Sequence, residues 1–440
     1  MNNSSLPLKR EFDFLSKQEI HNRQAVALFK VFQRCKDHPL VSERLNALNS
    51  AVKITPSNIL EHWENIKTID SVGHQNYLKN EDLPPEIYFS DHLSSITISS
   101  GGSRDIPKVT LLSFDEISRN SEFHGKGYSL AGITYTDRVA TFGLPGILSS
   151  EFTVYLALKE TGCRIYPIGE MSNPECLVTW IRKLNANVLL VMPSDLFPII
   201  EYLQSTKQRL DGIRLIVTGG EALSESQKRL TQQYIGNEFT LYRSTFQTSD
   251  CGTIGYQCEH CSDSEYHVHE ELQYIELIKE SSGKSILVTT NLDRTLMPLI
   301  RVKTGDYAEE VIEPCACGRN SRRIRLNGRV EKELKIGGEK FLTEILTLIP
   351  EYFNLTASDI AIRIIKTDSG KDQILIRLRE SLLASNSLQD KISSHVLGRA
   401  LKLKQQMQEK VVAPIEFTSL HANHIFKAET GKMLVFRDLR

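Results

Sequence analysis

Apolar positions change their spacing near residues 85 and 328, which divides the chain into three parts. Up to about residue 85, apolar residues recur at helical spacing, as in HNRQAVALFKVFQRC, and predict a helical N-terminal region (1–85). From about residue 90 to 305, short apolar runs alternate with helical patterns such as NPECLVTWIRKLN and SESQKRLTQQYI. The runs with strand character are SSITISS, ANVLLVM, IRLIVTG and SILVTTN. This alternation predicts βαβ units around a largely parallel sheet.

The chain beyond residue 328 has the pattern of a smaller unit. IAIRIIKT and QILIRLRE flank the turn-forming DSGKD and predict a β-hairpin. A helical stretch, SLQDKISSHVLGRALKLKQQMQEK, follows, and strand, loop and tail come after it. We therefore predict an α/β fold. A large N-terminal domain (1–328) has mixed and parallel sheets with helices, and a small α+β domain (329–440) follows it.

Charge and hydropathy narrow the class of protein. The 440 residues carry 53 Lys and Arg against 54 Asp and Glu, a net charge of −1, which argues against nucleic acid as a partner. No apolar run approaches the roughly 20 residues of a membrane span. The N-terminus lacks the apolar core of a signal peptide, so we expect a cytoplasmic protein without membrane contacts. Structural disulfides are then improbable, and the eight cysteines need another explanation.

Two segments of small residues follow strand-like runs and could bind anions. In the first, small and hydroxyl residues precede Lys108, and their backbone N–H groups could approach a phosphate closely. A flexible surface turn explains this segment equally well. The second, after IRLIVT, stands at the carboxyl end of a strand, where open α/β sheets bind ligands, although a plain turn is the alternative. The residues concerned are Ser99, Ser100, Gly101, Gly102 and Ser103, and Gly219, Gly220 and Glu221.

Two further positions carry groups that could contact a nucleotide. Asp306, in RVKTGDYAEE, could accept hydrogen bonds from a ribose, or it could simply form a turn. Lys432, beside Gly431 near the chain end, could reach a developing negative charge, or it could be a solvated lysine of the tail. Neither position is specific when it is taken alone.

The remaining signal is a cluster of cysteines and histidines in two loops, 251–270 and 315–319. Cys258, Cys261 and His267 belong to the first loop, and Cys315 and Cys317 belong to the second. Thiolate and imidazole ligands suit tetrahedral Zn²⁺, and four protein ligands leave no open position for catalysis. The loops therefore predict a structural zinc site, with unrelated cysteines as the alternative.

In their order and spacing, these segments resemble the adenylate-forming enzymes, closest to the phenylacetate–coenzyme A ligase branch. The resemblance covers about residues 20 to 440. It implies that residues 96–108 form the phosphate loop, that Gly219-Gly220-Glu221 lies beside the adenine, and that Asp306 binds the ribose. NGRVEKELKIGGEKF resembles the hinge segment, in which Arg329 contacts the ribose. GKMLVFR resembles the terminal segment, whose lysine, Lys432, contacts the carboxylate and the α-phosphate.

The resemblance also implies two metal sites. Phe246-Gln247-Thr248-Ser249-Asp250 stands where the family has Tyr-Gly-x-Thr-Glu, so Phe246 contacts the nucleotide and Asp250 replaces the glutamate that helps hold Mg²⁺. An alternative register puts Tyr242 in the aromatic position. For the zinc site, the branch pattern selects Cys258, His267, Cys315 and Cys317 as ligands, with Cys261 as a substitute for His267.

The activity that the resemblance implies is AMP-forming ligation of a small-molecule carboxylic acid to a thiol. ATP with Mg²⁺ gives an acyl-adenylate, and coenzyme A then accepts the acyl group. The small domain rotates as a mobile lid about residues 329–333 between the two steps. Transfer to a carrier protein, a protein cysteine or an amine is one alternative, and a degenerate nucleotide-binding protein is another. A homodimer is one oligomeric state that we consider for this protein.

Candidates for the acyl pocket come from three stretches of the sequence. They are Tyr128, Ala131, Gly132, Ile133, Phe142 and Gly143, together with Met192, Pro193 and Ser194, and Phe246. Aromatic and small residues suit a flat aryl acid or a short aliphatic one, and any of them could instead belong to the core.

Overall fold

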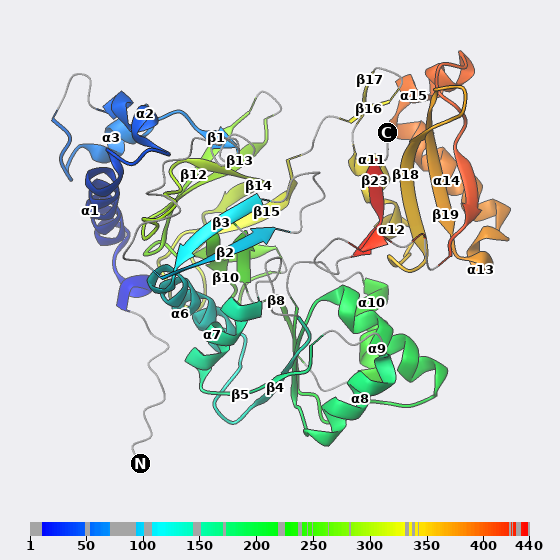
Figure 1. Ribbon diagram of the computed structural model, residues 1–440, viewed down its shortest axis with the longest axis horizontal. Coiled ribbons are helices and arrows are strands. Elements are labelled where there is room, and N and C mark those ends of the chain that lie inside the picture. The colour runs from blue at the N-terminus through cyan, green and yellow to red at the C-terminus, as the bar shows by residue number, and fades with distance from the viewer. Residues whose placement is uncertain are drawn as a thin grey trace.

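The computed structural model (Figure 1) has a large N-terminal part and a smaller C-terminal part. It describes residues 11–48, 53–70, 94–100, 108–143, 151–169, 173–218, 225–235, 240–243, 245–248, 250–262, 264–280, 283–330, 334–336, 339–341, 343–421, 424, 426–427 and 433–438. Among these residues, no helix combines the length and the apolar character that crossing a membrane requires.

A five-stranded parallel sheet forms the centre of the N-terminal part, in the order β5-β4-β6-β7-β8. Its strands are β4 (Arg138–Thr141), β5 (Arg164–Pro167), β6 (Val188–Val191), β7 (Leu215–Thr218) and β8 (Thr240–Arg243). Helices α6 (Phe114–Leu130) and α7 (Glu151–Thr161) cover one face, and α8 (Pro174–Lys183), α9 (Pro193–Ser205) and α10 (Glu225–Ile235) cover the other (Figure 1). In β6, Val188 packs toward α6 and α7, whereas Leu189 packs toward α8 and α9. Because both faces of β6 are buried, its sequence is a continuous apolar run.

A second sheet is largely antiparallel and corrects the prediction of one largely parallel sheet over residues 90–305. Its order is β12-β13-β14-β15-β11-β10-β9, with β1 (Ile69–Asp70) pairing beside β14. The run SILVTTN forms β13 (Ser285–Asn291), which pairs antiparallel with β12 (Gln273–Lys279) and β14 (Val302–Val311). These neighbours follow one another through helix-free connections, and antiparallel strands need no crossover helix. The other members are β9 (Thr245–Thr248), β10 (Gly252–Tyr256), β11 (Glu265–Val268) and β15 (Arg323–Arg329).

The described part of the N-terminal region is mainly helical, and the short strand β1 departs from the helical prediction. It contains η1 (Glu11–Phe14), α1 (Lys17–Cys35), α2 (Ser42–Leu45), η2 (Asn46–Leu48) and α3 (Ile59–Trp63). A capping box between Ser16 and Glu19 begins α1. Leu28 and Trp63 are buried with Met297 in one apolar cluster, which fixes these helices against the antiparallel sheet.

The C-terminal part has a four-stranded sheet, β20-β19-β18-β23, and the predicted hairpin is its centre. Strands β18 (Ile360–Lys366) and β19 (Asp372–Leu378) pair antiparallel, with β20 (Glu416–Ser419) and β23 (Phe436–Asp438) at the edges. The single predicted helix is wrong in one respect, because Ala400 leaves the helical conformation and separates α14 (Asn386–Arg399) from α15 (Leu401–Gln408). Shorter elements are α11 (Glu344–Thr347), α12 (Ile349–Tyr352), α13 (Glu380–Leu383), β16 (Leu334–Ile336), β17 (Glu339–Phe341), β21 (Phe426–Lys427) and β22 (Met433–Leu434).

Candidate active site and metal centre

The carboxyl ends of the parallel strands bring several predicted site segments to one edge of the sheet. Phe142 and Gly143 follow β4, Met192 follows β6, and the Gly219-Gly220-Glu221 segment follows β7 in sequence. The chain from β4 turns to the face of α7, whereas the chain from β6 turns to the face of α9. The strand order therefore reverses between these two neighbours, which is where open α/β sheets have their ligand crevice. Residues 219–221 themselves lie outside the described residues.

The serine- and glycine-rich segment joins two antiparallel strands, β2 (Ser95–Ser100) and β3 (Lys108–Ser113). Their register pairs Ser99 with Val109 and Ser100 with Lys108. Gly101, Gly102 and Ser103 lie outside the described residues, as do the side chains of Ser99, Ser100 and Lys108. The predicted phosphate segment is therefore the connection of a hairpin, and its two ends are fixed next to each other.

Asp306 and Arg329 are direct cross-strand partners. Asp306 lies in β14, Arg329 is the last residue of β15, and the register pairs the two Cα positions. Asp306 is buried, and its N–H donates to the hydroxyl of Thr304 at 3.1 Å. The side chain of Arg329 lies outside the description. Two residues that lie 23 positions apart in the sequence are thus neighbours where β15 ends.

The strand β9 and the loop after it carry Phe246 and Asp250. The Phe246 ring lies 5.7 Å from the Tyr266 ring, and both side chains are buried. Asp250 is also buried, and its Oδ1 accepts a hydrogen bond from the N–H of Cys251 at 3.2 Å. Its carboxylate is a hard oxygen donor of the kind that Mg²⁺ prefers. Tyr242, the alternative aromatic residue, lies in β8, and its side chain is outside the description.

A compact Cys₃His cluster forms from the two cysteine loops. The ligand atoms of Cys258, His267, Cys315 and Cys317 all lie within 4.8 Å of one another. The Sγ of Cys258 is 3.6 Å from both the Sγ of Cys315 and the Nε2 of His267, and the Sγ of Cys317 is 3.4 Å from that Nε2. A zinc–sulfur tetrahedron with bonds of about 2.3 Å has edges of about 3.8 Å. The donor set and its dimensions therefore fit Zn²⁺.

Cys261 lies at the edge of this cluster. Its Sγ is 3.6 Å from the Sγ of Cys258, but Cys261 does not belong to the compact group of four. The arrangement thus favours His267 over the substitute ligand.

The surroundings of the cluster orient its ligands. The Nδ1 of His267 is 3.1 Å from the Ser321 hydroxyl, which leaves Nε2 to face the thiols. Burial acts to raise the pKa of Cys317, but hydrogen bonds from His267 and Arg319 outweigh it and lower the pKa to about 5. Cys317 therefore has the thiolate character of a metal ligand.

A buried ionic network behind the cluster was not predicted from the sequence. Asp13 accepts a hydrogen bond from the Tyr256 hydroxyl at 3.0 Å, forms an ion pair with Lys126, and lies 3.7 Å from the Nε of Arg319. The Tyr256 ring stacks on His267, with 5.4 Å between centroids. The network ties η1 to the 315–319 loop. The one sequence signal for it is Arg319, directly after Cys317-Gly318, because Asp13 and Lys126 belong to no pattern.

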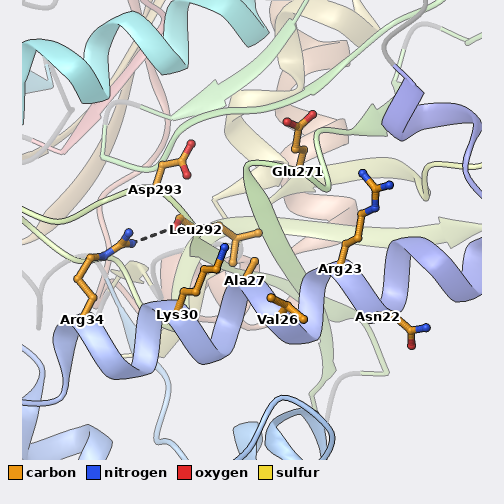
Figure 2. Close-up of a pocket in the computed structure, with 9 residues that line it drawn as sticks. All are labelled: Asn22, Arg23, Val26, Ala27, Lys30, Arg34, Glu271, Leu292 and Asp293. Carbon is orange, nitrogen blue, oxygen red and sulfur yellow. Dashed lines mark hydrogen bonds between the residues drawn. The ribbon is translucent and has the colours of Figure 1, made fainter.

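A surface pocket of about 450 Å³ lies elsewhere, between α1 and the 292–293 loop (Figure 2). Arg23, Lys30 and Arg34 line one side of it, and Glu271 and Asp293 line the other. Both carboxylates are already engaged by Arg119, at 2.8 and 3.1 Å respectively. None of the predicted site residues lines this pocket.

Comparison with known proteins identifies the fold. No family model matches the chain. A crystal structure of 2-hydroxyisobutyryl-CoA ligase, in the postadenylation state with 2-HIB-AMP, superimposes with a TM-score of 0.71 at 16% identity, covering 98% of this chain and 92% of that one. The fold is that of the adenylate-forming ligases. The thioesterification state of the same ligase, with 2-HIB-AMP and CoA, gives a TM-score of 0.63 over 98% of this chain at 17% identity.

Similarity in sequence is more limited. The indoleacetate–lysine synthetase of Pseudomonas savastanoi is 26% identical over 223 residues, which are 48% of this chain and 53% of that protein. The match therefore spans about half the length of each. The likeness confirms the predicted resemblance and fold class, with a large N-terminal and a small C-terminal domain.

The contacts in the structure assign no ligand-binding role to the remaining predicted site residues. Tyr128, Ala131 and Ile133 pack in the apolar cluster between α6, α7 and the sheet, and Phe142 packs on the opposite face. They therefore contribute to the core. Lys432 and the hinge residues 331–333 lie outside the described residues, and the domain boundary at 328/329 stays a prediction.

Proposed function

We propose that this protein activates a carboxylic acid with ATP and transfers the acyl group to a thiol, with coenzyme A as the acceptor. The observation that carries the proposal is the pairing of Asp306 with Arg329 across β14 and β15. The backbone register brings an acidic and a basic residue together where β15 ends, and charged groups of these two types can bind the hydroxyls of a ribose and its phosphate. The ligase fold adds support, because the two residues belong to its predicted nucleotide segments.

In the first step, a carboxylate oxygen attacks the α-phosphorus of ATP, the bond to the β-phosphate breaks, and pyrophosphate leaves. Two anions must meet, so the task of the protein is to position them and to neutralise charge. Lys432 contacts the carboxylate and the α-phosphate, and Asp250 supplies an oxygen ligand to Mg²⁺. The β2–β3 connection holds the phosphates, and the segment after β7 lies against the adenine. The residues of these two segments are Ser99, Ser100, Gly101, Gly102, Ser103 and Lys108, and Gly219, Gly220 and Glu221.

In the second step, the thiol sulfur attacks the acyl carbon, and AMP leaves with its electron pair on the phosphate oxygen. An amine acceptor is the second candidate, because the sequence relative is an indoleacetate–lysine synthetase. In that case, nitrogen attacks the same carbon and an amide results.

The Cys₃His cluster has a structural role in this proposal. Cys258, His267, Cys315 and Cys317 would close the coordination sphere of Zn²⁺, so they would leave no open position for chemistry and would hold the two cysteine loops together around the ion.

The deciding experiment is ATP–pyrophosphate exchange with a library of carboxylic acids, followed by product analysis with and without coenzyme A. Exchange with one class of acid, and a thioester only when coenzyme A is present, is the expected result. Exchange that yields an amide with added amines, and no thioester, selects the second candidate. Absence of exchange with every acid, while ATP still binds, refutes both.

A further inference from the structure

A buried arginine joins the two segments to which the proposed function assigns the phosphates and the metal. Arg294, in the connection between β13 and β14, is 4% exposed. Its Nη1 donates to the carbonyl of Leu111 in β3 at 3.1 Å, and its Nη2 donates to the carbonyl of Asp250 at 3.0 Å. One rigid guanidinium therefore fixes the distance between the hairpin that ends in the serine- and glycine-rich segment and the loop that carries Asp250.

The charge of this guanidinium is balanced within the same junction. The Nη1 of Arg294 lies 3.9 Å from Glu116, whose carboxylate also accepts hydrogen bonds from the N–H groups of Thr295 at 2.6 Å and Ser113 at 2.8 Å. Ser113 and Glu116 form the capping box that begins α6, directly after β3. The helix, the hairpin and the 294–295 segment thus converge on one buried ion pair.

Side chains from other segments hold the backbone of the loop after Asp250. The Cys251 carbonyl accepts from Gln273 at 2.9 Å and from Asn291 at 3.1 Å. The N–H of Thr253 donates to Asn120 at 2.8 Å. Gly252 has a φ of +76°, and a Cβ there would lie 2.5 Å from the Asn120 amide oxygen. Only glycine fits without a shift, so the loop conformation is closely specified.

Burying an ion pair is a costly way to stabilise a core, because apolar side chains of similar volume often stabilise it as well or better. The specific gain here is geometric, because the guanidinium donates hydrogen bonds to two carbonyl groups from segments that lie 139 positions apart in the chain. We propose that Arg294 is a positioning residue, which sets the distance between the phosphate-binding hairpin and Asp250 and so enables tight binding of Mg²⁺·ATP. This inference rests on the proposed function, since Arg294 itself touches no substrate.

The test compares Arg294→Met with a matched control, Arg301→Met. Arg301 is also buried, donates to the carbonyls of Glu64 and Ile66, and pairs with Glu276 at 2.8 Å, but it contacts neither segment. Hydrogen–deuterium exchange is measured in the full chain for peptides covering 108–113 and 248–253, and the dissociation constant of Mg²⁺·ATP is measured by calorimetry. Arg294→Lys is the conservative variant, which keeps the positive charge but replaces the planar fork of two N–H groups with one ammonium nitrogen.

We expect Arg294→Met to lose protection from hydrogen–deuterium exchange in both peptides. It should also bind Mg²⁺·ATP about tenfold more weakly than Arg301→Met, and Arg294→Lys should be intermediate. The KM for ATP in pyrophosphate exchange should rise by the same factor, while the KM for the acid stays unchanged. Unchanged protection in either peptide, or equal affinities in the two methionine variants, overturns the inference. If the wild type itself shows no exchange activity, the proposed function is refuted. The protection data would then still decide whether Arg294 couples the two segments.

Discussion

Protonation of one buried histidine should destabilise the protein in acid. His124, in α6, is 1% exposed, and its Nε2 lies 3.2 Å from the Thr245 hydroxyl. Within the described part of the chain, its Nδ1 has no hydrogen-bond partner, and the ring packs on Tyr128 with 4.5 Å between centroids. An imidazolium must donate from both nitrogens. Burial therefore lowers the pKa of His124 from 6.5 to about 4.

The size and sign of the effect follow from proton linkage. Because the pKa is lower in the folded state, the unfolded chain takes up a proton first, near pH 6.5, as the pH falls. The stabilisation is complete above pH 6.5 and is lost progressively down to about pH 4. At about 1.4 kcal/mol per pKa unit, the free energy of unfolding should fall by about 2–3 kcal/mol between roughly pH 7.5 and 4.5 from this residue alone.

Urea unfolding at a series of pH values measures this quantity for the wild type and for His124→Gln, whose amide does not titrate. The difference between the two free-energy curves isolates the histidine and should change by about 2–3 kcal/mol across the range. The control is His21→Gln, on the exposed face of α1, which removes a histidine without a buried ring. A difference curve for His124→Gln that is flat within about 0.5 kcal/mol would refute the reasoning. Since Thr245 begins β9, the strand of Phe246, acid should also disturb the candidate site.

Three further outcomes test the proposed roles. Lys432→Ala should abolish formation of the acyl-adenylate and leave the fold intact, because charge on the carboxylate and α-phosphate is no longer neutralised; normal pyrophosphate exchange would remove Lys432 from the reaction. Asp306→Ala should weaken ATP binding by about 1.5–3 kcal/mol through loss of charged hydrogen bonds, so an unchanged dissociation constant by calorimetry contradicts its ribose role. Metal analysis should find about one zinc per chain, and Cys317→Ser should lose it, whereas a stable, metal-free wild type would exclude the zinc site.

Local periodicity predicted the elements well but not how the strands pair. The helix over α1 and the β18–β19 hairpin both follow from spacing and turn residues that lie within a few positions of each other. The run SILVTTN resembles a buried parallel strand, because every residue of β13 after Ser285 is buried, although its partners β12 and β14 run antiparallel to it. Its direction depends on strands β12 and β14, so a strand's own sequence cannot reveal it.

The residues of the candidate site also differ in how far the sequence could predict them. Ligand chemistry restricts residue types strongly, so the cysteines and His267 could be recognised as metal-ligand candidates, but the choice of Cys258, His267, Cys315 and Cys317 over Cys261 came from the resemblance to the ligase branch. Arg294 could not be predicted, because its partners are backbone carbonyls, which leave no trace in residue identity. Ser113 and Glu116 have the spacing of a capping box, but that pattern indicates only the start of a helix and not the ion pair with Arg294.

The Cys₃His cluster and the Asp306–Arg329 pair lie toward opposite ends of strand β15. Strand β15 has seven residues, which span about 23 Å; its N-terminal end follows Ser321, and its C-terminal end is Arg329. A slip of one residue would turn every side chain of β15 to the other face and separate Arg329 from Asp306. The contact of Ser321 with His267 anchors the start of β15 beside β11, so the cluster restrains the register at the far end. A zinc ion held by these four residues would thus affect nucleotide binding without contacting the nucleotide, because it would limit the positions in which β15 can pair.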